Sequence, residues 1–191
     1  MKKVIIGIDP GTISLGYGII LVSNKDVVIL EYDSIDLGKK DILEIKLKNI
    51  FFKIVELIDR HKVNEMAVEA PFYGKNVQSM LKLGKAQGVA IAAGLSRSLP
   101  FFEYTPRKIK QSITGNGNAS KEQIASMLIN LNYLKELPKK LDTTDALATA
   151  LCHYMQGSSA DNTNNSSHSK NKYNSWSSFI SDNSERVVKQ K

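Results

Sequence analysis

KVIIGIDPG, residues 3–11, predicts a buried β-strand that ends on the carboxylate of Asp9. Pro10 has no backbone N–H to donate to a neighbouring strand, and Gly11 can adopt the positive φ of a tight turn, so the strand stops there. Burying a carboxylate between an isoleucine and a turn is costly unless a cation lies beside it. The structural alternative is that Asp9 accepts hydrogen bonds from backbone N–H groups of the turn, as aspartate often does.

Apolar runs and turns around this strand predict an α/β fold. Runs at residues 18–22 and 27–32 follow at short intervals and favour an antiparallel meander with the first strand. An amphipathic helix at 41–61 leads to a short strand at 66–69, an order that favours parallel pairing with the first strand. With a fifth strand at 101–104, we expect a five-stranded mixed sheet flanked by helices, three strands antiparallel and then two parallel. Further helices are expected at residues 76–97, 107–113, 121–132 and 143–155.

The second long helix, at residues 76–97, carries a stripe of small residues. Gly84, Gly88 and Ala92 recur four residues apart, and such a stripe lets another backbone approach closely. The sequence leaves two partners open for it, the sheet or a second subunit.

The composition divides the chain into a folded part, residues 1–156, and a tail, residues 157–191. The tail holds ten serines and six asparagines, so we expect it to be disordered because it has too little apolar surface to bury. Its aromatic residues Tyr173, Trp176 and Phe179 are either a short docking motif or part of an idle tail.

Bulk properties argue against a membrane-spanning protein and against a signal peptide. No run of about 18 apolar residues exists, and the apolar run near the N-terminus is too short for a signal peptide. The single cysteine, Cys152, cannot form an internal disulfide, which favours a reducing, cytoplasmic location. The formal net charge of +7 favours a polyanionic partner.

The positive charge is concentrated between residues 75 and 121. This segment holds eight basic residues against one acid, Glu103. A surface that faces phosphates is favoured over a solvated helix face. The basic residues are Lys75, Lys82, Lys85, Arg97, Arg107, Lys108, Lys110 and Lys121.

Three further acids are expected to join Asp9. Glu69 ends the strand predicted to lie parallel to the first, so the two carboxylates share one sheet edge, where α/β sheets hold their sites. Asp142 and Asp145 lie three apart and share a helix face, although Asp142 as an N-cap is a structural alternative.

Such a group of carboxylates calls for a metal ion. Two of them about 4 Å apart repel by roughly 4 kcal/mol at an effective dielectric constant near 20, so the cluster favours a hard divalent cation such as Mg²⁺. A pair of Mg²⁺ ions held in this way activates water and stabilises the leaving oxygen in phosphodiester cleavage.

Five sequence blocks resemble the RuvC family of Holliday-junction resolvases over residues 3–155. The resemblance implies a ribonuclease-H-like fold and a homodimer that resolves four-way DNA junctions in recombination and repair. It also implies symmetric nicking that leaves 5′-phosphate and 3′-hydroxyl ends, two Mg²⁺ ions per subunit with Mn²⁺ as a substitute, and the RuvA and RuvB branch-migration proteins as partners. The blocks are GIDPGT at 7–12, VEAPFYGKN at 68–76, LKLGKAQGVAIAAG at 81–94, YTPRKIKQSITGNGNASK at 104–121 and DTTDALA at 142–148.

The resemblance also assigns roles to individual residues. The four acids of the family fall on Asp9, Glu69, Asp142 and Asp145. Two helper lysines fall on Lys110 and Lys121, which are expected to contact the scissile phosphate. An aromatic residue falls on Phe72, which is expected to stack on a junction base, the alternative being a packed core residue. The full set expected to contact DNA is Phe72, Lys75, Lys82, Lys85, Arg107, Lys108, Lys110 and Lys121.

Three alternative functions can be compared with this one. A junction-binding protein without catalysis and a ribonuclease-H-like nuclease that acts on RNA would share this fold. An actin-like ATPase also opens with a strand and D-x-G-T, but it needs a second such loop, which the chain lacks.

Overall fold

The computed structural model describes residues 2–24, 26–38, 40–71, 76–136, 138 and 142–163, except the side chains of Asp142 and residues 158–163. The chain divides into two units, Met1–Gly157 and Ser158–Lys191. The fold described below is that of the first unit.

Five strands form one mixed sheet in the order β3-β2-β1-β4-β5. The first three strands pair antiparallel, whereas β1 with β4 and β4 with β5 pair parallel. This topology confirms the predicted α/β fold with three antiparallel and two parallel strands. The strands are β1 (Lys2–Asp9), β2 (Ser14–Ser23), β3 (Asp26–Asp36), β4 (Glu65–Glu69) and β5 (Phe101–Tyr104).

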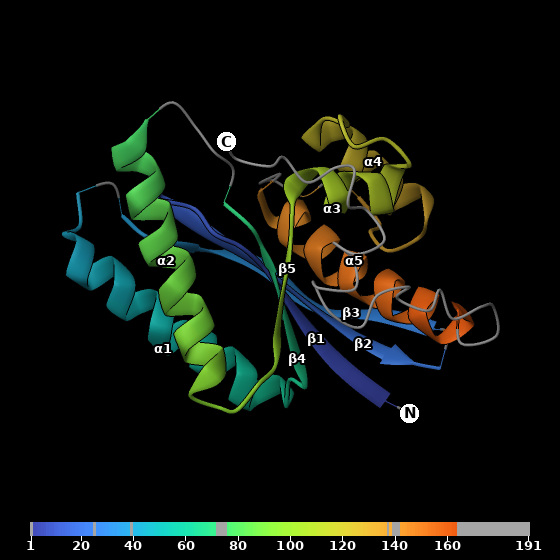
Figure 1. The fold of residues 1–191 in the computed structure, drawn as a ribbon, viewed down its shortest axis with the longest axis horizontal. Coiled ribbons are helices and arrows are strands. Elements are labelled where there is room, and N and C mark those ends of the chain that lie inside the picture. The colour runs from blue at the N-terminus through green and yellow to red at the C-terminus, as the bar shows by residue number, and fades with distance from the viewer. Residues whose placement is uncertain are drawn as a thin grey trace, which may run out of the picture. The chain divides into compact units, whose positions relative to one another are not determined.

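Helices cover both faces of the sheet (Figure 1). On one face, α1 and α2 pack on Ile6 and Ile8 of β1. On the other face, α3, α4 and α5 pack on Ile5 of β1 and on Ile20 of β2. The helices are α1 (Leu43–His61), α2 (Val77–Leu95), α3 (Pro106–Thr114), α4 (Lys121–Asn130) and α5 (Asp142–Thr163).

Helix α5 lies unusually close to the sheet because two glycines face it. Gly7 of β1 pairs with Gly18 of β2. A Cβ at Gly7 would lie 2.2 Å from the carbonyl oxygen of Ala146, and a Cβ at Gly18 would lie 2.7 Å from the Cα of Leu147. Because the two glycines have no side chains, the backbone of α5 packs directly against the sheet at these positions.

The predicted end of α5 was wrong. The sequence places it at residue 155 and begins a disordered tail at 157, whereas the helix continues to Thr163. Each further residue of an established helix adds a hydrogen bond without a new nucleation step, so polar residues can prolong it. The rest of the predicted tail, 164–191, lies outside the described residues.

The stripe of small residues on α2 faces outward. Gly84, Gly88 and Ala92 are exposed, and a Cβ at Gly84 or Gly88 would meet no described atom within 4 Å beyond the helix backbone. The sheet is thereby excluded as the partner of this stripe. Within the described part of the chain, every helix is too short or too polar to cross a membrane.

Candidate active site

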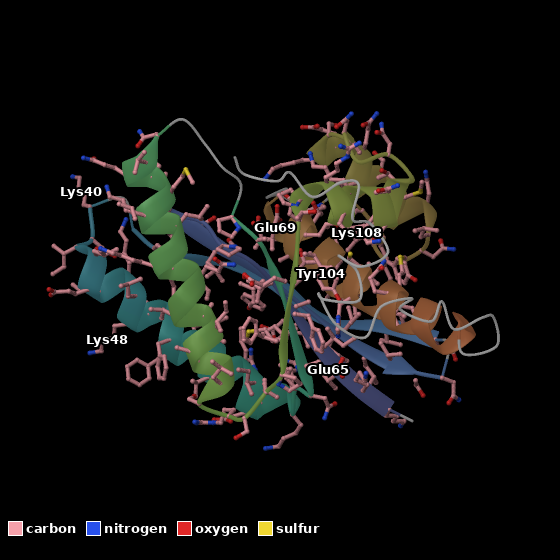
Figure 2. The ribbon with its side chains drawn as sticks, in the orientation of Figure 1. Lys40, Lys48, Glu65, Glu69, Tyr104 and Lys108 are labelled. Atoms are coloured by element: carbon pink, nitrogen blue, oxygen red, sulfur yellow. The ribbon has the colours of Figure 1, made fainter. Side chains whose placement is uncertain are left out.

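The parallel pairing of β1 and β4 brings two carboxylates to one edge of the sheet. Ile8 is opposite Val68 in the register, so Asp9 and Glu69 follow at adjacent strand ends. Their side chains share a hydrogen bond. Figure 2 shows Glu69 at the opposite end of β4 from Glu65.

Helix α5 supplies a third carboxylate from across the sheet edge. The side chain of Asp145 is buried, with 8% of the residue exposed. Its Oδ2 lies 2.6 Å from Nζ of Lys121, at the start of α4. The structure thus brings together Asp9, Glu69 and Asp145, which are far apart in the sequence.

The pKa of Glu69 records the crowding of negative charge. Burial raises this pKa to about 7, and repulsion from Asp145 adds to the shift. The ammonium group of Lys121, the hydrogen bond with Asp9 and the ammonium group of Lys110 act in the opposite direction, but they do not offset the shift fully. The shift is therefore due first to burial of the carboxyl group and second to the nearby charge of Asp145.

These groups line a cleft of about 1060 Å³ between the sheet edge and helices α3 and α4. The cleft is lined by both carboxylates and cations. Its charged and polar lining residues are Asp9, Glu69, Thr105, Arg107, Lys110, Asn118, Lys121 and Asp145.

The other residues expected at the site are not part of the lining of the cleft or lie outside the described residues. Lys85 and Lys108 are exposed and do not belong to the lining of the cleft. Phe72 and Lys75 lie outside the described residues, and so does the side chain of Asp142, whose backbone begins α5. Lys82 lines a neighbouring hollow.

One basic residue of the 75–121 segment serves a different purpose. Arg97 donates two hydrogen bonds to the carboxylate of Asp59, with Nε 2.8 Å from Oδ1 and Nη2 2.9 Å from Oδ2. It links the segment after α2 to α1 and is not part of the cleft.

Sequence reasoning missed two polar residues of the cleft. Thr105 caps α3 by accepting a hydrogen bond from the N–H of Lys108, ahead of Pro106 at the first helical position. Asn118 belongs to the loop between α3 and α4. The Thr-Pro pair signals a helix start, but no local pattern indicates that Thr105 or Asn118 faces the carboxylates.

The donor set fits a hard divalent cation. Asp9, Glu69 and Asp145 offer oxygen atoms only, which Mg²⁺ prefers. Among the described side chains, no three acids, histidines or cysteines are already gathered closely enough to hold an ion. In the arrangement observed, Asp145 is turned toward Lys121.

The sequence model of one protein family, "Crossover junction endodeoxyribonuclease RuvC", matches residues 5–153. The chain belongs to the RuvC family. A family member from Cytophaga hutchinsonii is 48% identical over 187 residues, which cover 98% of this chain and 89% of that protein. Another, from Christiangramia forsetii, is 49% identical and covers 97% of this chain and 93% of that protein. These alignments run past residue 153, where the family match ends.

Solved RuvC structures share the fold. Thermus thermophilus RuvC in complex with a Holliday junction substrate has a TM-score of 0.77 and 29% identity, covering 83% of this chain and 96% of that one. The yeast mitochondrial Holliday junction resolvase Ydc2 has a TM-score of 0.62 at 14% identity, covering 84% and 83% of the two chains. The ribonuclease-H-like fold expected from the sequence is confirmed.

Proposed function

We propose that this member of the RuvC family resolves four-way DNA junctions in recombination and repair by nicking two opposing strands symmetrically. Each cut leaves a 5′-phosphate and a 3′-hydroxyl, which a ligase can seal. The observation that carries the proposal is the meeting of Asp9, Glu69 and Asp145 in a cleft whose opposite wall is basic. Carboxylates that can hold a metal ion, beside basic side chains that can contact phosphates, suit a phosphodiester substrate.

The carboxylates of Asp9, Glu69, Asp142 and Asp145 would hold two Mg²⁺ ions per subunit, with Mn²⁺ as a substitute. When bound, such ions lower the pKa of an attacking water and stabilise the leaving oxygen. The contribution of the chain is to present the carboxylates from two strand ends and one helix. Asp145, paired with Lys121 in the arrangement observed, would turn to join the other acids around the ions.

Lys110 and Lys121 supply positive charge from the helical side of the cleft. Lys121 neutralises Asp145 at 2.6 Å, and both ammonium groups lower the pKa of Glu69. In the complex with DNA, they stabilise the negative charge that develops on the scissile phosphate.

Affinity for the junction comes from cations that contact phosphates without reading sequence. Arg107 lies in the cleft itself, and further phosphate contacts are expected from Lys75, Lys82, Lys85 and Lys108. Phe72 stacks on a base near the branch point, since base–aromatic stacking tolerates any sequence.

A homodimer matches the symmetry of the substrate, because a two-fold protein presents two identical sites to a nearly two-fold junction. The outward face of α2 suits this interface. Val77, Leu81 and Leu95 are 66%, 62% and 54% exposed there, on the same face as the small-residue stripe. The nuclease domain comprises residues 1–156, and in the cell it works with the RuvA and RuvB branch-migration complex.

The decisive experiment compares labelled four-way, splayed and linear duplex DNA, with and without Mg²⁺. The wild-type chain should cut the four-way junction symmetrically near the branch point and leave the other substrates intact. Asp9→Asn should retain junction binding and lose nicking, because it removes charge at the metal cluster and leaves the basic surface unchanged. Wild-type nicking by Asp9→Asn would overturn the assignment of the site, and cleavage of all three substrates alike would overturn the substrate.

A further inference from the structure

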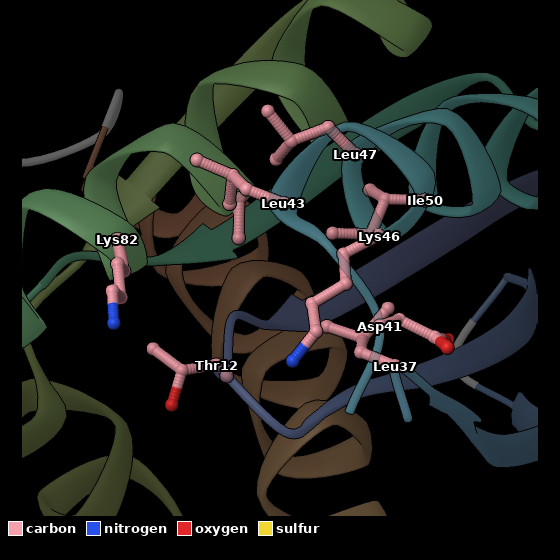
Figure 3. A pocket seen from close by; sticks show the side chains of 10 residues that line it. Thr12, Leu37, Asp41, Leu43, Lys46, Leu47, Ile50 and Lys82 are labelled. Carbon is pink, nitrogen blue, oxygen red and sulfur yellow. The ribbon is translucent and has the colours of Figure 1, made fainter. Parts of the chain in front are cut away.

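A second hollow, of about 190 Å³, is formed by three separate elements. The turn after β1 contributes Thr12, the first turns of α1 contribute Lys46, and α2 contributes Lys82 (Figure 3). Apolar side chains of Leu47 and Ile50 close it from the protein interior.

The positive charge in this hollow lacks a counterion in the described part of the chain. Lys46 is half-buried, yet neither it nor Lys82 belongs to the ion pairs of the described residues. Asp41 is the one acid of the lining, and its carboxylate packs over Gly38. Figure 3 shows it pointing away from the ammonium group of Lys46. Two ammonium groups and a hydroxyl in one hollow form a set of donors suited to an anion.

Two residues of the hollow are close in sequence to residues of the cleft. Thr12 follows Asp9 by three residues, and Lys82 follows Met80, which lines the cleft, by two. The Cα atoms of Asp9 and Thr12 are therefore at most about 11 Å apart, roughly three nucleotide rises along one DNA strand.

We propose that Thr12, Lys46 and Lys82 bind one backbone phosphate of the DNA strand that passes the acid cluster. The proposal rests on the proposed function and adds a binding site to it. A phosphate accepts hydrogen bonds from the hydroxyl and from both ammonium groups. The contact fixes the register of the strand relative to the carboxylates and does not read its sequence.

The test measures the salt dependence of junction binding in EDTA, where no cleavage occurs. Each phosphate contact contributes about 0.9 to the slope of log K against log salt concentration. Because both lysines contact the same phosphate, the double variant Lys46→Gln/Lys82→Gln should reduce the slope by about 0.9 per subunit, so that the affinity lost between 50 and 200 mM salt falls about 3.5-fold per subunit. Lys46→Gln and Lys82→Gln alone should each reduce the slope by part of that amount. Lys46→Arg should retain the wild-type slope because it retains the charge.

Lys48→Gln is the matched control. Lys48 lies on the same helix, is exposed, and is not part of the hollow. Lys48→Gln removes the same charge from the chain as Lys46→Gln, so a general electrostatic effect would change the slope equally in these two variants. Thermal unfolding should give similar midpoints for the three Lys→Gln variants, since none of these side chains belongs to the core.

A second arm identifies the phosphate. Junctions with one neutral methylphosphonate at successive positions near the branch point should show one position per strand at which the wild-type slope falls and Lys46→Gln adds no further loss. Additive losses at every position, or a wild-type slope for Lys46→Gln, would overturn the phosphate site. Failure of the wild-type chain to prefer four-way junctions would instead overturn the proposed function, so the two failures are distinguishable.

Discussion

The pKa of Glu69 reports the electrostatic environment of the cleft. Its pKa is about 7 in the folded chain because of burial and the neighbouring Asp145, against an ordinary value of 4.5. Between these pH values the folded state binds the additional proton. Stability therefore falls as the pH rises from 4.5 through 7, by about 3 kcal/mol for a shift of this size.

Glu69→Gln should abolish most of that decline in the metal-free protein. Urea unfolding in EDTA at pH 5 and pH 8 measures it, and the variant should exceed the wild type in stability at pH 8. Glu44→Gln, an exposed acid in the first turn of α1, should keep the wild-type pH dependence. If Glu69→Gln destabilises the protein equally at both pH values, the carboxyl group is not strained by its neighbours.

At the scale of elements, the position of α5 depends on the paired glycines of β1 and β2. A methyl group at Gly7 would collide with the carbonyl oxygen of Ala146 and with the N–H of Ala150, so α5 would have to move away from the sheet. Since α5 carries Asp145, that movement would also draw this carboxylate away from Asp9 and Glu69.

Gly7→Ala should lower the free energy of unfolding by about 1–3 kcal/mol, the usual cost of overpacking, and should reduce the rate of junction nicking. Gly157→Ala is the control. Gly157 lies in α5, and a methyl group added there meets no described atom within 4 Å. It should leave stability unchanged or raise it by up to about 1 kcal/mol. Equal stability of Gly7→Ala and the wild type in urea unfolding would contradict the close seating of α5.

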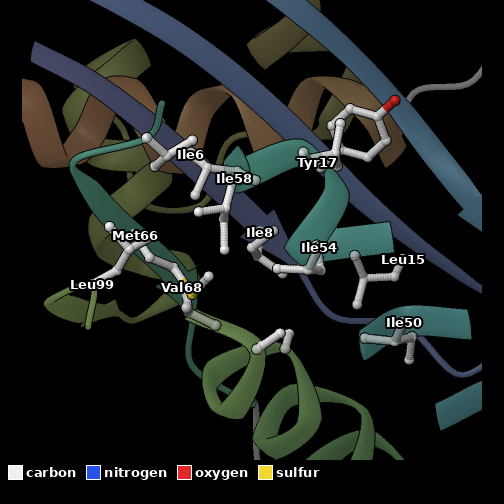
Figure 4. Packing of buried hydrophobic residues seen from close by; sticks show 14 of the residues in the cluster. Ile6, Ile8, Leu15, Tyr17, Ile50, Ile54, Ile58, Met66, Val68 and Leu99 are labelled. Carbon is white, nitrogen blue, oxygen red and sulfur yellow. The ribbon is translucent and has the colours of Figure 1, made fainter. Parts of the chain in front are cut away.

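Most of the elements could be predicted because their periodicity is set by local chemistry. The apolar stripe of α1 turns Ile50, Ile54 and Ile58 into the core (Figure 4), and a capping box of Ser120 and Gln123 begins α4. The strands of the sheet could likewise be predicted from apolar runs bounded by turn residues.

What the sequence could not supply was contact between distant segments. A glycine within a strand signals close approach of another backbone, but neither Gly7 nor Gly18 says which helix approaches. The ion pair of Lys121 with Asp145 and the hollow of Lys46 with Lys82 join elements dozens of residues apart. The convergence of Asp9 with Glu69 was accessible because parallel strands align their ends by rule.

At the scale of the whole molecule, the question is how two sites are presented to one junction. The outward face of α2 exposes Val77, Leu81 and Leu95 in line with Gly84 and Gly88. Small residues between apolar ones allow two such helices to approach closely. The opposite face of α2 is committed to the core through Ala86, Ala90 and Ala93, so this helix links the proposed interface directly to the sheet that carries the carboxylates.

Leu81→Lys should convert the proposed dimer to a monomer, because it places a charge on the apolar face of α2. Analytical ultracentrifugation measures the mass, and circular dichroism should remain that of the folded chain. Phe52→Lys is the matched control, since Phe52 is 60% exposed on α1, on the same side of the sheet, and its replacement should leave the dimer intact. The monomer should still bind four-way junctions weakly but lose paired cutting, because the second nick depends on a partner held in the symmetric position. A Leu81→Lys chain that sediments as a dimer would move the interface to another surface.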